Sequence, residues 1–262
     1  MKYIIVTTSN HSLICHLQSQ PTVEPTQPVD VPTLKPTCAE NGDFNLCLAI
    51  DMSGSVCGGF CENCGECNSG GTNLSICCSN FANMLDFSKS LVRSLGDLRT
   101  NQDFSVVHFA TDVDIASTLE NRNQAVKTIN QLKYTGGSTN LAGAINSCQS
   151  TLDDSPSDRK NLILILTDGA PTVPEFNAEE AATAAANNAM NKDTFIIPIL
   201  IDDPNFLNRP EVPYLENNIS SDGKVFVADF DGLGNLQDAV FEQVTCQANT
   251  STRRKSQTLP WN

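Results

Sequence analysis

The sequence has few basic residues for its length. Its 262 residues include 16 Lys and Arg against 30 Asp and Glu, which gives a formal net charge of −14 and a pI near 4.4. A protein that neutralises nucleic-acid phosphates, or that docks on an anionic membrane, needs a basic surface. We therefore expect no nucleic-acid partner, and an acidic surface that repels such partners or recruits cations.

The sequence also has no long apolar run. No segment approaches the roughly 20 apolar residues that cross a bilayer, so we expect no membrane insertion. Residues 1–20 combine Lys2 with a short apolar run from Tyr3 to Val6. We interpret them as a weak or truncated signal segment, with a mis-assigned start or an internal fragment as the alternative. Residues 21–37 interleave prolines with threonines, which is typical of an extended linker.

Cysteine, in contrast, is abundant. Eleven cysteines in a chain of this length are unusual for a reducing cytosol, where closely spaced thiols mostly bind metals or carry redox chemistry. Four Asn-x-Ser/Thr sequons agree with export, and they begin at Asn10, Asn73, Asn218 and Asn249. We therefore expect a secreted or extracellular protein with these four asparagines as glycosylation candidates.

Alternating strand and helix patterns predict an α/β fold. Apolar runs typical of strands cover 46–50, 104–109, 113–117, 162–166, 195–201 and 225–228, and helical patterns cover 81–95, 121–132, 141–152, 178–190 and 236–246. The run 162–166 is apolar on both faces, as a buried parallel strand requires. Pro198 is unfavourable inside the fifth run. We predict a doubly wound, mostly parallel sheet with one antiparallel edge strand, from a hairpin at 104–117, and with helices on both faces.

Three short polar motifs lie beside these predicted elements. Asp51-Met52-Ser53-Gly54-Ser55 follows the first strand, Gly136-Gly137-Ser138-Thr139 precedes the helix at 141–152, and Thr167-Asp168-Gly169 ends the fourth strand. Ligands of open α/β sheets bind at the carboxyl ends of strands, so we expect the motifs to share one rim. Their carboxylates and hydroxyls are the oxygen ligands that a hard cation such as Mg²⁺ prefers. The alternative is that all three are ordinary turns, because Asp and Ser side chains often bond nearby amides.

In this order, and on this β/α background, the motifs resemble the metal-ion-dependent adhesion site (MIDAS) of von Willebrand factor type A (VWA) domains. The resemblance extends over roughly residues 43–246 and implies a Rossmann-like VWA fold. It implies that Ser53, Ser55 and Thr139 touch a metal ion, that Asp51 and Asp168 hold it directly or through water, and that a ligand carboxylate fills an open position. It further implies a role in adhesion or protein binding, without catalytic activity.

The sequence departs from the family between Ser55 and the first predicted helix, where residues 57–78 form a cysteine-rich insertion. Its six cysteines are Cys57, Cys61, Cys64, Cys67, Cys77 and Cys78. We expect three disulfides whose pairing the sequence does not determine. Zinc is the alternative, because Cys61, Cys64 and Cys67 have ligand-like spacing. The insertion follows the expected metal rim directly, so we expect it to shape or limit the access of a ligand.

The other cysteines fit the same extracellular frame. Cys38 precedes the first strand and Cys246 ends the last predicted helix, so a disulfide between them would join the two ends of the domain, as in some members of the family. Cys47 and Cys148 lie on predicted core elements, where they either pair or stay as buried free thiols. We accordingly delimit a VWA domain at 38–246, followed by a polar, basic tail at 247–262.

The sequence thus predicts an extracellular adhesion-type module that coordinates Mg²⁺ or Mn²⁺ and accepts an acidic group of a protein or glycan partner. The alternative is a structural component of an extracellular matrix or cell wall, in which the domain is a scaffold. We expect no enzymatic activity, because no histidine follows a strand end where it could act as a base for Ser53 or Ser55.

Overall fold

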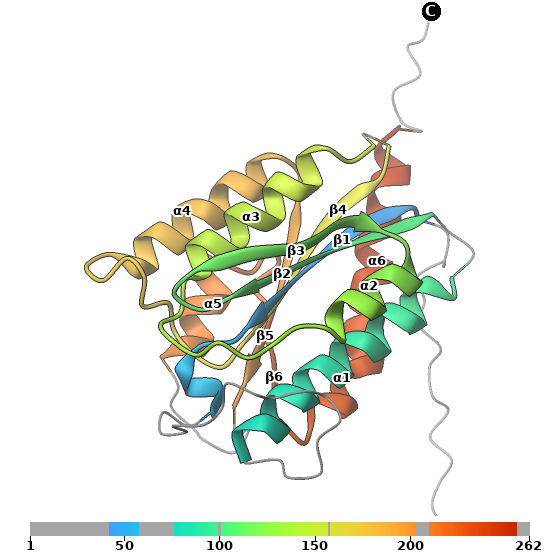
Figure 1. Ribbon diagram of the computed structural model, residues 1–262. Helices are drawn as coiled ribbons and strands as arrows, with labels where there is room; N and C mark the ends of the chain where they lie inside the picture. Colours follow the sequence, from blue (N-terminus) through green and yellow to red (C-terminus); the bar gives the residue numbers. More distant parts are fainter. Residues whose placement is uncertain (1–41, 58–75, 99–100, 157, 203–209, 256–262) are drawn as a thin grey trace, which may run out of the picture. The chain divides into compact units, whose positions relative to one another are not determined.

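The computed structural model describes residues 42–57, 76–98, 101–156, 158–202 and 210–255. In these residues a six-stranded sheet has the order β3-β2-β1-β4-β5-β6 (Figure 1). The strands are β1 (Phe44–Asp51), β2 (Gln102–Phe109), β3 (Val113–Glu120), β4 (Lys160–Thr167), β5 (Phe195–Ile201) and β6 (Phe226–Ala228). Only β2 and β3 pair antiparallel, so the predicted mostly parallel sheet with one antiparallel edge strand is confirmed.

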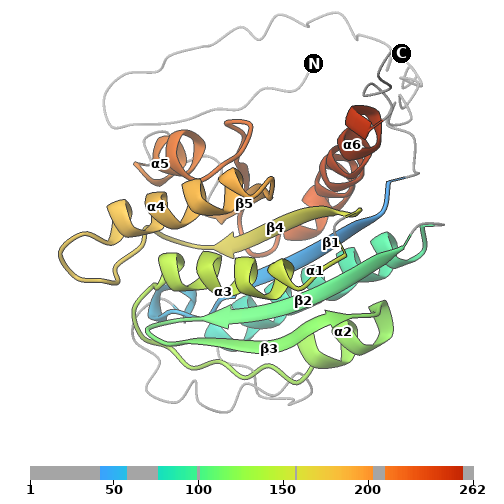
Figure 2. The ribbon, with the colours of Figure 1, turned by 90° about the horizontal axis from the view of Figure 1, so that it is seen from above.

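Helices cover both faces of this sheet, as predicted. They are α1 (Ile76–Gly96), α2 (Arg122–Ile129), α3 (Leu141–Asp153), α4 (Ala178–Asn191), α5 (Glu211–Asn218) and α6 (Gln237–Lys255), with 3-10 turns η1 (Gly54–Cys57) and η3 (Leu233–Leu236). One hydrophobic cluster joins α1, α2 and α6 to the sheet, and a second joins α3, α4 and α5 to the opposite face (Figures 1 and 2). No helix in the described part of the chain combines the length and apolarity that a membrane span requires.

The central strand β1 shows how the sequence produces these layers. Leu46, Leu48 and Ile50 belong to the first cluster, whereas Cys47 and Ala49 belong to the second. Successive side chains of a strand point to opposite faces, and a sheet covered on both sides must be apolar on both. All eight residues of β1 are buried, which places its carboxyl end between two helix layers.

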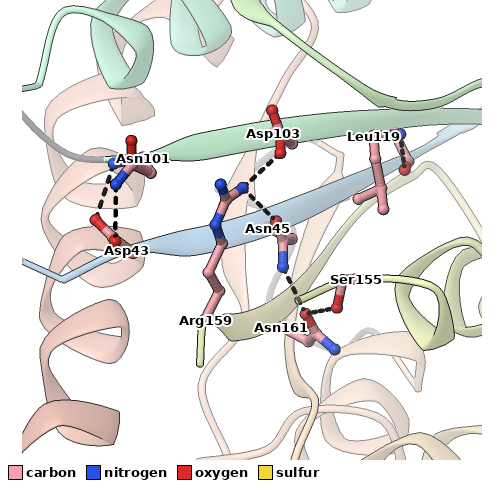
Figure 3. Close-up of polar contacts among 9 residues, drawn as sticks. Asp43, Asn45, Asn101, Asp103, Leu119, Ser155, Arg159 and Asn161 are labelled. Atoms are coloured by element: carbon pink, nitrogen blue, oxygen red, sulfur yellow. Dashed lines mark hydrogen bonds and ion pairs between the residues drawn. The ribbon is translucent and has the colours of Figure 1, made fainter. Parts of the chain in front are cut away.

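At the edge where the parallel strands begin, polar side chains are paired with one another (Figure 3). Buried Asn45 donates a 3.1 Å hydrogen bond to Oδ1 of Asn161, which also accepts one from Ser155 at 2.9 Å. Arg159 donates to Oδ1 of Asn45 at 3.2 Å and forms an ion pair with Asp103. Buried polar groups are costly unless they are hydrogen-bonded. The network therefore stabilises this edge by satisfying these groups internally.

Three features differ from the sequence pattern. Pro198 does lie within β5, opposite Ile165, but β6 pairs only with residues 199–201, so the second ladder begins after the proline. The helix α5 was not predicted, because it has only eight residues and only Leu215 among them is fully buried. A helix this short gives a weak periodic signal. The last helix, α6, extends beyond Cys246 to Lys255.

A disulfide joins Cys47 of β1 to Cys148 of α3, with the Cα atoms 5.5 Å apart. Both residues are fully buried, so of the two alternatives for this pair the structure shows the disulfide. Cys246 is also disulfide-bonded. Cys38 lies outside the described residues, so its pairing with Cys246 stays a prediction.

Several other predictions concern parts of the chain outside the described residues. These parts are the signal segment, the linker, nearly all of the insertion with the side chains of its six cysteines, and the sequons at Asn10 and Asn73. The side chain of Asn249 is likewise outside them. Asn218 ends α5, where its amide donates a 3.1 Å hydrogen bond to the carbonyl of Tyr214.

Candidate metal centre

The first motif (51–55) and the third motif (167–169) follow two neighbouring strands, β1 and β4, whose next helices pack on opposite faces of the sheet. From β1 the chain continues into α1, and from the neighbouring β4 it continues into α4, which packs on the opposite face. Segments that diverge from adjacent parallel strands leave a crevice at the carboxyl ends of those strands. Asp51 ends β1 and Asp168 follows β4, so both acids lie beside this crevice. Both views place η1 and the segment before α4 at the same, left-hand end of the domain (Figures 1 and 2).

Asp51 is fully buried and is fixed by two hydrogen bonds. Its Oδ1 accepts from the backbone N–H of Ser53 and its Oδ2 accepts from the hydroxyl of Thr167, each at 2.7 Å. Burial raises the pKa of Asp51, because removal from water penalises the charged form more than these hydrogen bonds favour it. The carboxyl group therefore has a fixed orientation and little access to solvent.

Ser53, Ser55 and Asp168 continue from Asp51 as one hydrogen-bonded series. The two serine hydroxyls are 3.0 Å apart, and Ser55 donates to Oδ1 of Asp168 at 2.7 Å. Burial, and secondarily the negative charge of Asp51, raises the pKa of Asp168 to about 7. Among the described residues, neither carboxylate forms an ion pair with Lys or Arg. Four of the five predicted ligands are thus brought together.

Thr139 is brought to the same place by the backbone of its loop. The N–H of Gly54 donates to the carbonyl of Gly137 at 2.8 Å, and the N–H of Gly136 donates to the carbonyl of Met52 at 3.0 Å. These bonds attach the loop before α3 directly to the Asp51–Ser55 motif. Thr139 itself is buried, with 4% of its surface exposed. The fifth predicted ligand therefore lies on a segment fixed to the other motif.

Gly137 determines how closely this loop approaches the β2–β3 turn. Its φ of +109° is rare for residues with a side chain, and a Cβ here would lie 2.6 Å from Oγ1 of Thr111. The same Oγ1 accepts a 2.9 Å hydrogen bond from the N–H of Ser138. Glycine is thus required both by the backbone conformation and by the contact with Thr111.

The sequence did not reveal the residues that position the predicted ligands. Tyr134 donates from its hydroxyl to the carbonyl of Ser53 at 2.9 Å, across 81 residues, and Oγ1 of Thr172 accepts from the N–H of Thr139 at 2.8 Å, across 33 residues. No local pattern connects such distant partners. Thr167 is different, because it belongs to a recognised motif and its neighbour Asp168 already indicated the site.

The assembled donors suit a hard divalent cation. They are two carboxylates and several hydroxyls, and no group of three or more His, Cys, Asp or Glu side chains that could hold a metal is found among the described residues. Oxygen ligands of this kind favour Mg²⁺ or Mn²⁺ over soft metals that select thiolates. Two carboxylates without a basic partner repel each other, and a bound cation relieves that repulsion. The residues present therefore fit such an ion.

Residues 45–239 match the model of the von Willebrand factor type A domain, and the chain belongs to this family. Over 101 residues it is 34% identical to inter alpha-trypsin inhibitor, heavy chain 4, of Mus musculus, a match that covers 34% of this chain and 11% of that protein. The predicted family is therefore confirmed, while the chain corresponds to only a small part of this curated relative.

Solved structures show the same fold. Proximal thread matrix protein 1 from the mussel byssus is 17% identical with a TM-score of 0.60, over 79% of this chain and 47% of that one. Another structure of it has a zinc-occupied MIDAS motif (19% identity, TM-score 0.60, 79% and 48% coverage). The manganese-loaded TRAP protein of Plasmodium vivax is 16% identical with a TM-score of 0.51, over 80% of this chain and 74% of that one. The chain spans about half the length of the mussel protein.

Proposed function

We propose that this chain is an extracellular binding module that holds Mg²⁺ or Mn²⁺ and accepts a carboxylate of a protein or glycan partner. Asp51, Ser53, Ser55, Thr139 and Asp168 hold the ion. One observation carries the proposal: two carboxylates without an ion-pair partner among the described residues lie at the carboxyl ends of β1 and β4 beside two bonded serine hydroxyls, one of which donates to Asp168.

The burial of these residues indicates the direction from which a partner approaches. Asp51 and Ser53 are fully or almost fully buried, whereas Ser55 is exposed and Asp168 is partly exposed. Because the hydroxyls are neutral, a bound ion keeps enough positive charge to attract an acidic oxygen from outside. The partner therefore approaches over Ser55 and Asp168, while Thr167 and Tyr134 keep the deeper ligands in place.

The relatives support this proposal. The similar structures include a manganese-loaded protein, a protein with zinc in its MIDAS motif and a pilus adhesin, SpaC of Lactobacillus rhamnosus GG. Mussel byssus and pilus proteins act outside the cell, in agreement with an extracellular location and with the buried disulfide of this chain.

We also infer that the domain has no enzymatic activity. Among the described residues no histidine lies beside the site serines: the one histidine there, His108, has its Nε2 4.0 Å from Asp114 at the edge of the sheet. The carboxylate that accepts from Ser55 belongs to Asp168, a proposed metal ligand. A nucleophilic serine requires a base within hydrogen-bonding distance. Turnover of ester or peptide substrates by the purified chain would contradict this inference.

Calorimetric titration of the full chain with Mg²⁺ and with Mn²⁺ tests the metal site. We expect one site that is lost in Asp51→Ala and in Asp168→Ala but retained in Asp154→Ala, a control at the exposed C-cap residue of α3. Capture of partners from extracellular extract, with and without EDTA, then tests adhesion. Capture that EDTA does not weaken would favour the scaffold alternative, and the absence of a metal site in the parent would refute the proposal.

A further inference from the structure

Phe176 is almost completely exposed, at 95% of its surface. The other large exposed apolar side chain in the described residues, Ile115 of β3, is exposed by 47%. An exposed phenylalanine lacks most of the favourable free energy that burial of its ring would provide. Exposed aromatic side chains are frequent anchors of protein interfaces. The distance of Phe176 from the metal centre therefore decides whether one partner can contact both.

The segment that presents Phe176 is bonded directly to the metal loop. Thr172 and Thr139 exchange two hydrogen bonds: the N–H of Thr139 donates to Oγ1 of Thr172 at 2.8 Å, and the N–H of Thr172 donates to the carbonyl of Thr139 at 2.9 Å. The N–H of Val173 donates to the same carbonyl at 3.3 Å. On the other side of Phe176, Ala178 begins α4 and is buried. Phe176 thus stands on a segment fixed at both ends.

The length of this segment limits how far Phe176 lies from the site. Phe176 is the fourth residue after Thr172, so the two Cα atoms are at most about 14 Å apart. A standard protein interface covers roughly 800 Å² of each partner, which corresponds to a radius of about 16 Å. Because Thr172 is hydrogen-bonded to the proposed ligand Thr139, a standard interface centred on this pair extends to Phe176. Figures 1 and 2 show the segment before α4 and the η1 turn at the same end of the domain.

The charged residues near Phe176 along the chain are all acidic. Glu175, Glu179 and Glu180 flank it, and no Lys or Arg occurs from residue 169 to residue 191. An acidic group of a partner would be repelled here, whereas Lys or Arg beside an apolar side chain would be attracted. The metal and Phe176 consequently favour different side chains of one partner.

We propose that Phe176 is a second anchor of the binding site. A protein segment that gives one carboxylate to the metal packs an apolar side chain, flanked by Lys or Arg, against the ring of Phe176. This inference rests on the proposed function, which it makes more specific: the partner is a peptide segment with an acidic residue and an apolar-basic pair a few residues away.

A synthetic peptide array tests the proposal with the full chain. Each peptide carries one Asp or Glu separated by one to four residues from a Phe-Lys or Leu-Arg pair, and matched peptides replace either the acid by its amide or the apolar residue by Ser. Parent, Phe176→Ala and Phe176→Leu are compared in Mg²⁺ and in EDTA. We expect the parent to capture the complete peptides only in Mg²⁺, with Phe176→Ala weaker by about tenfold and Phe176→Leu within about threefold.

The outcomes separate this inference from the proposed function. Mg²⁺-dependent capture that is equal for the parent and Phe176→Ala would overturn the second anchor and leave the metal function intact. Capture by the parent that ignores EDTA, or no capture of any acidic peptide, would overturn both. Phe176→Ala could also weaken capture of the Ser-substituted peptides by the same factor as capture of the complete peptides. That result would show a general effect on the site and would also overturn the second anchor. Calorimetry with Mg²⁺ and thermal unfolding verify that Phe176→Ala keeps its metal site and its fold.

Discussion

The hydroxyl of Thr167, the last residue of β4, donates a 2.7 Å hydrogen bond to Oδ2 of Asp51, the last residue of β1, and both residues are fully buried. The bond joins the two neighbouring strands at the point where their following segments diverge. It fixes one carboxylate oxygen of Asp51 beside the proposed metal position. Mutation of groups that orient metal ligands in this way typically lowers metal affinity by roughly 10–100-fold.

Removal of this hydroxyl is expected to weaken metal binding. Thr167→Val keeps the shape of the side chain but leaves a buried carboxylate oxygen without its donor, which costs about 1–3 kcal/mol. We expect Mg²⁺ affinity by calorimetry to fall about tenfold or more, and Thr167→Ser to restore most of it. Unchanged affinity in Thr167→Val would show that Asp51 does not depend on this bond.

Asp168→Asn is expected to raise the stability of the metal-free domain and to remove the stabilisation by Mg²⁺. The exchange removes a negative charge that burial and Asp51 disfavour, while its Oδ1 can still accept from Ser55. In EDTA we expect a melting temperature a few degrees above that of the parent, for a gain of about 1–3 kcal/mol. In Mg²⁺ the parent should gain stability and the variant should not. The exposed Asp154→Asn is the control, and a variant less stable than the parent in EDTA would contradict the prediction.

The Cys47–Cys148 disulfide is expected to stabilise the domain substantially. It closes a loop over a sequence separation of 101 residues, for which chain entropy predicts about 4–5 kcal/mol. The double variant Cys47→Ala/Cys148→Ala should therefore unfold at a clearly lower denaturant concentration. Because both cysteines are fully buried, a thiol reagent with reductant should label them only after unfolding. Rapid labelling in native buffer would contradict this expectation.

His108 is expected to make the domain less stable in mild acid. Burial lowers its pKa below 6.5, and the nearby Asp114 offsets this only in part. His108 therefore binds a proton more readily in the unfolded chain than in the folded one. Its contribution to the stability of the domain is complete above about pH 6.5 and is lost as the pH falls toward the folded-state pKa. We expect the stability of the parent relative to His108→Gln to decrease between pH 7.5 and 5. Measuring the difference between the two proteins cancels the other titrating groups, and a difference independent of pH would refute the assignment.

Much of the site could be predicted because its ligands belong to short motifs. Asp51, Ser53 and Ser55 lie within one segment of five residues, and Asp168 directly follows a strand that is apolar on both faces. The proximity of the motifs followed from a general property of parallel sheets, whose strands end at one edge. Tyr134, Thr172 and Thr111 could not be predicted, because each acts on a partner far away in the sequence through a single hydroxyl.

The sequence by itself determined the order of the strands and of every helix except α5, the family and the candidate ligands, because periodicity and motif spacing are local properties of the chain. Only the tertiary structure decided that Cys47 pairs with Cys148, that α5 forms, and that Phe176 remains exposed on a segment bonded to Thr139. These outcomes depend on which distant atoms come within contact distance. That is set by the packing of helices on both faces of the sheet, and no short stretch of sequence encodes it.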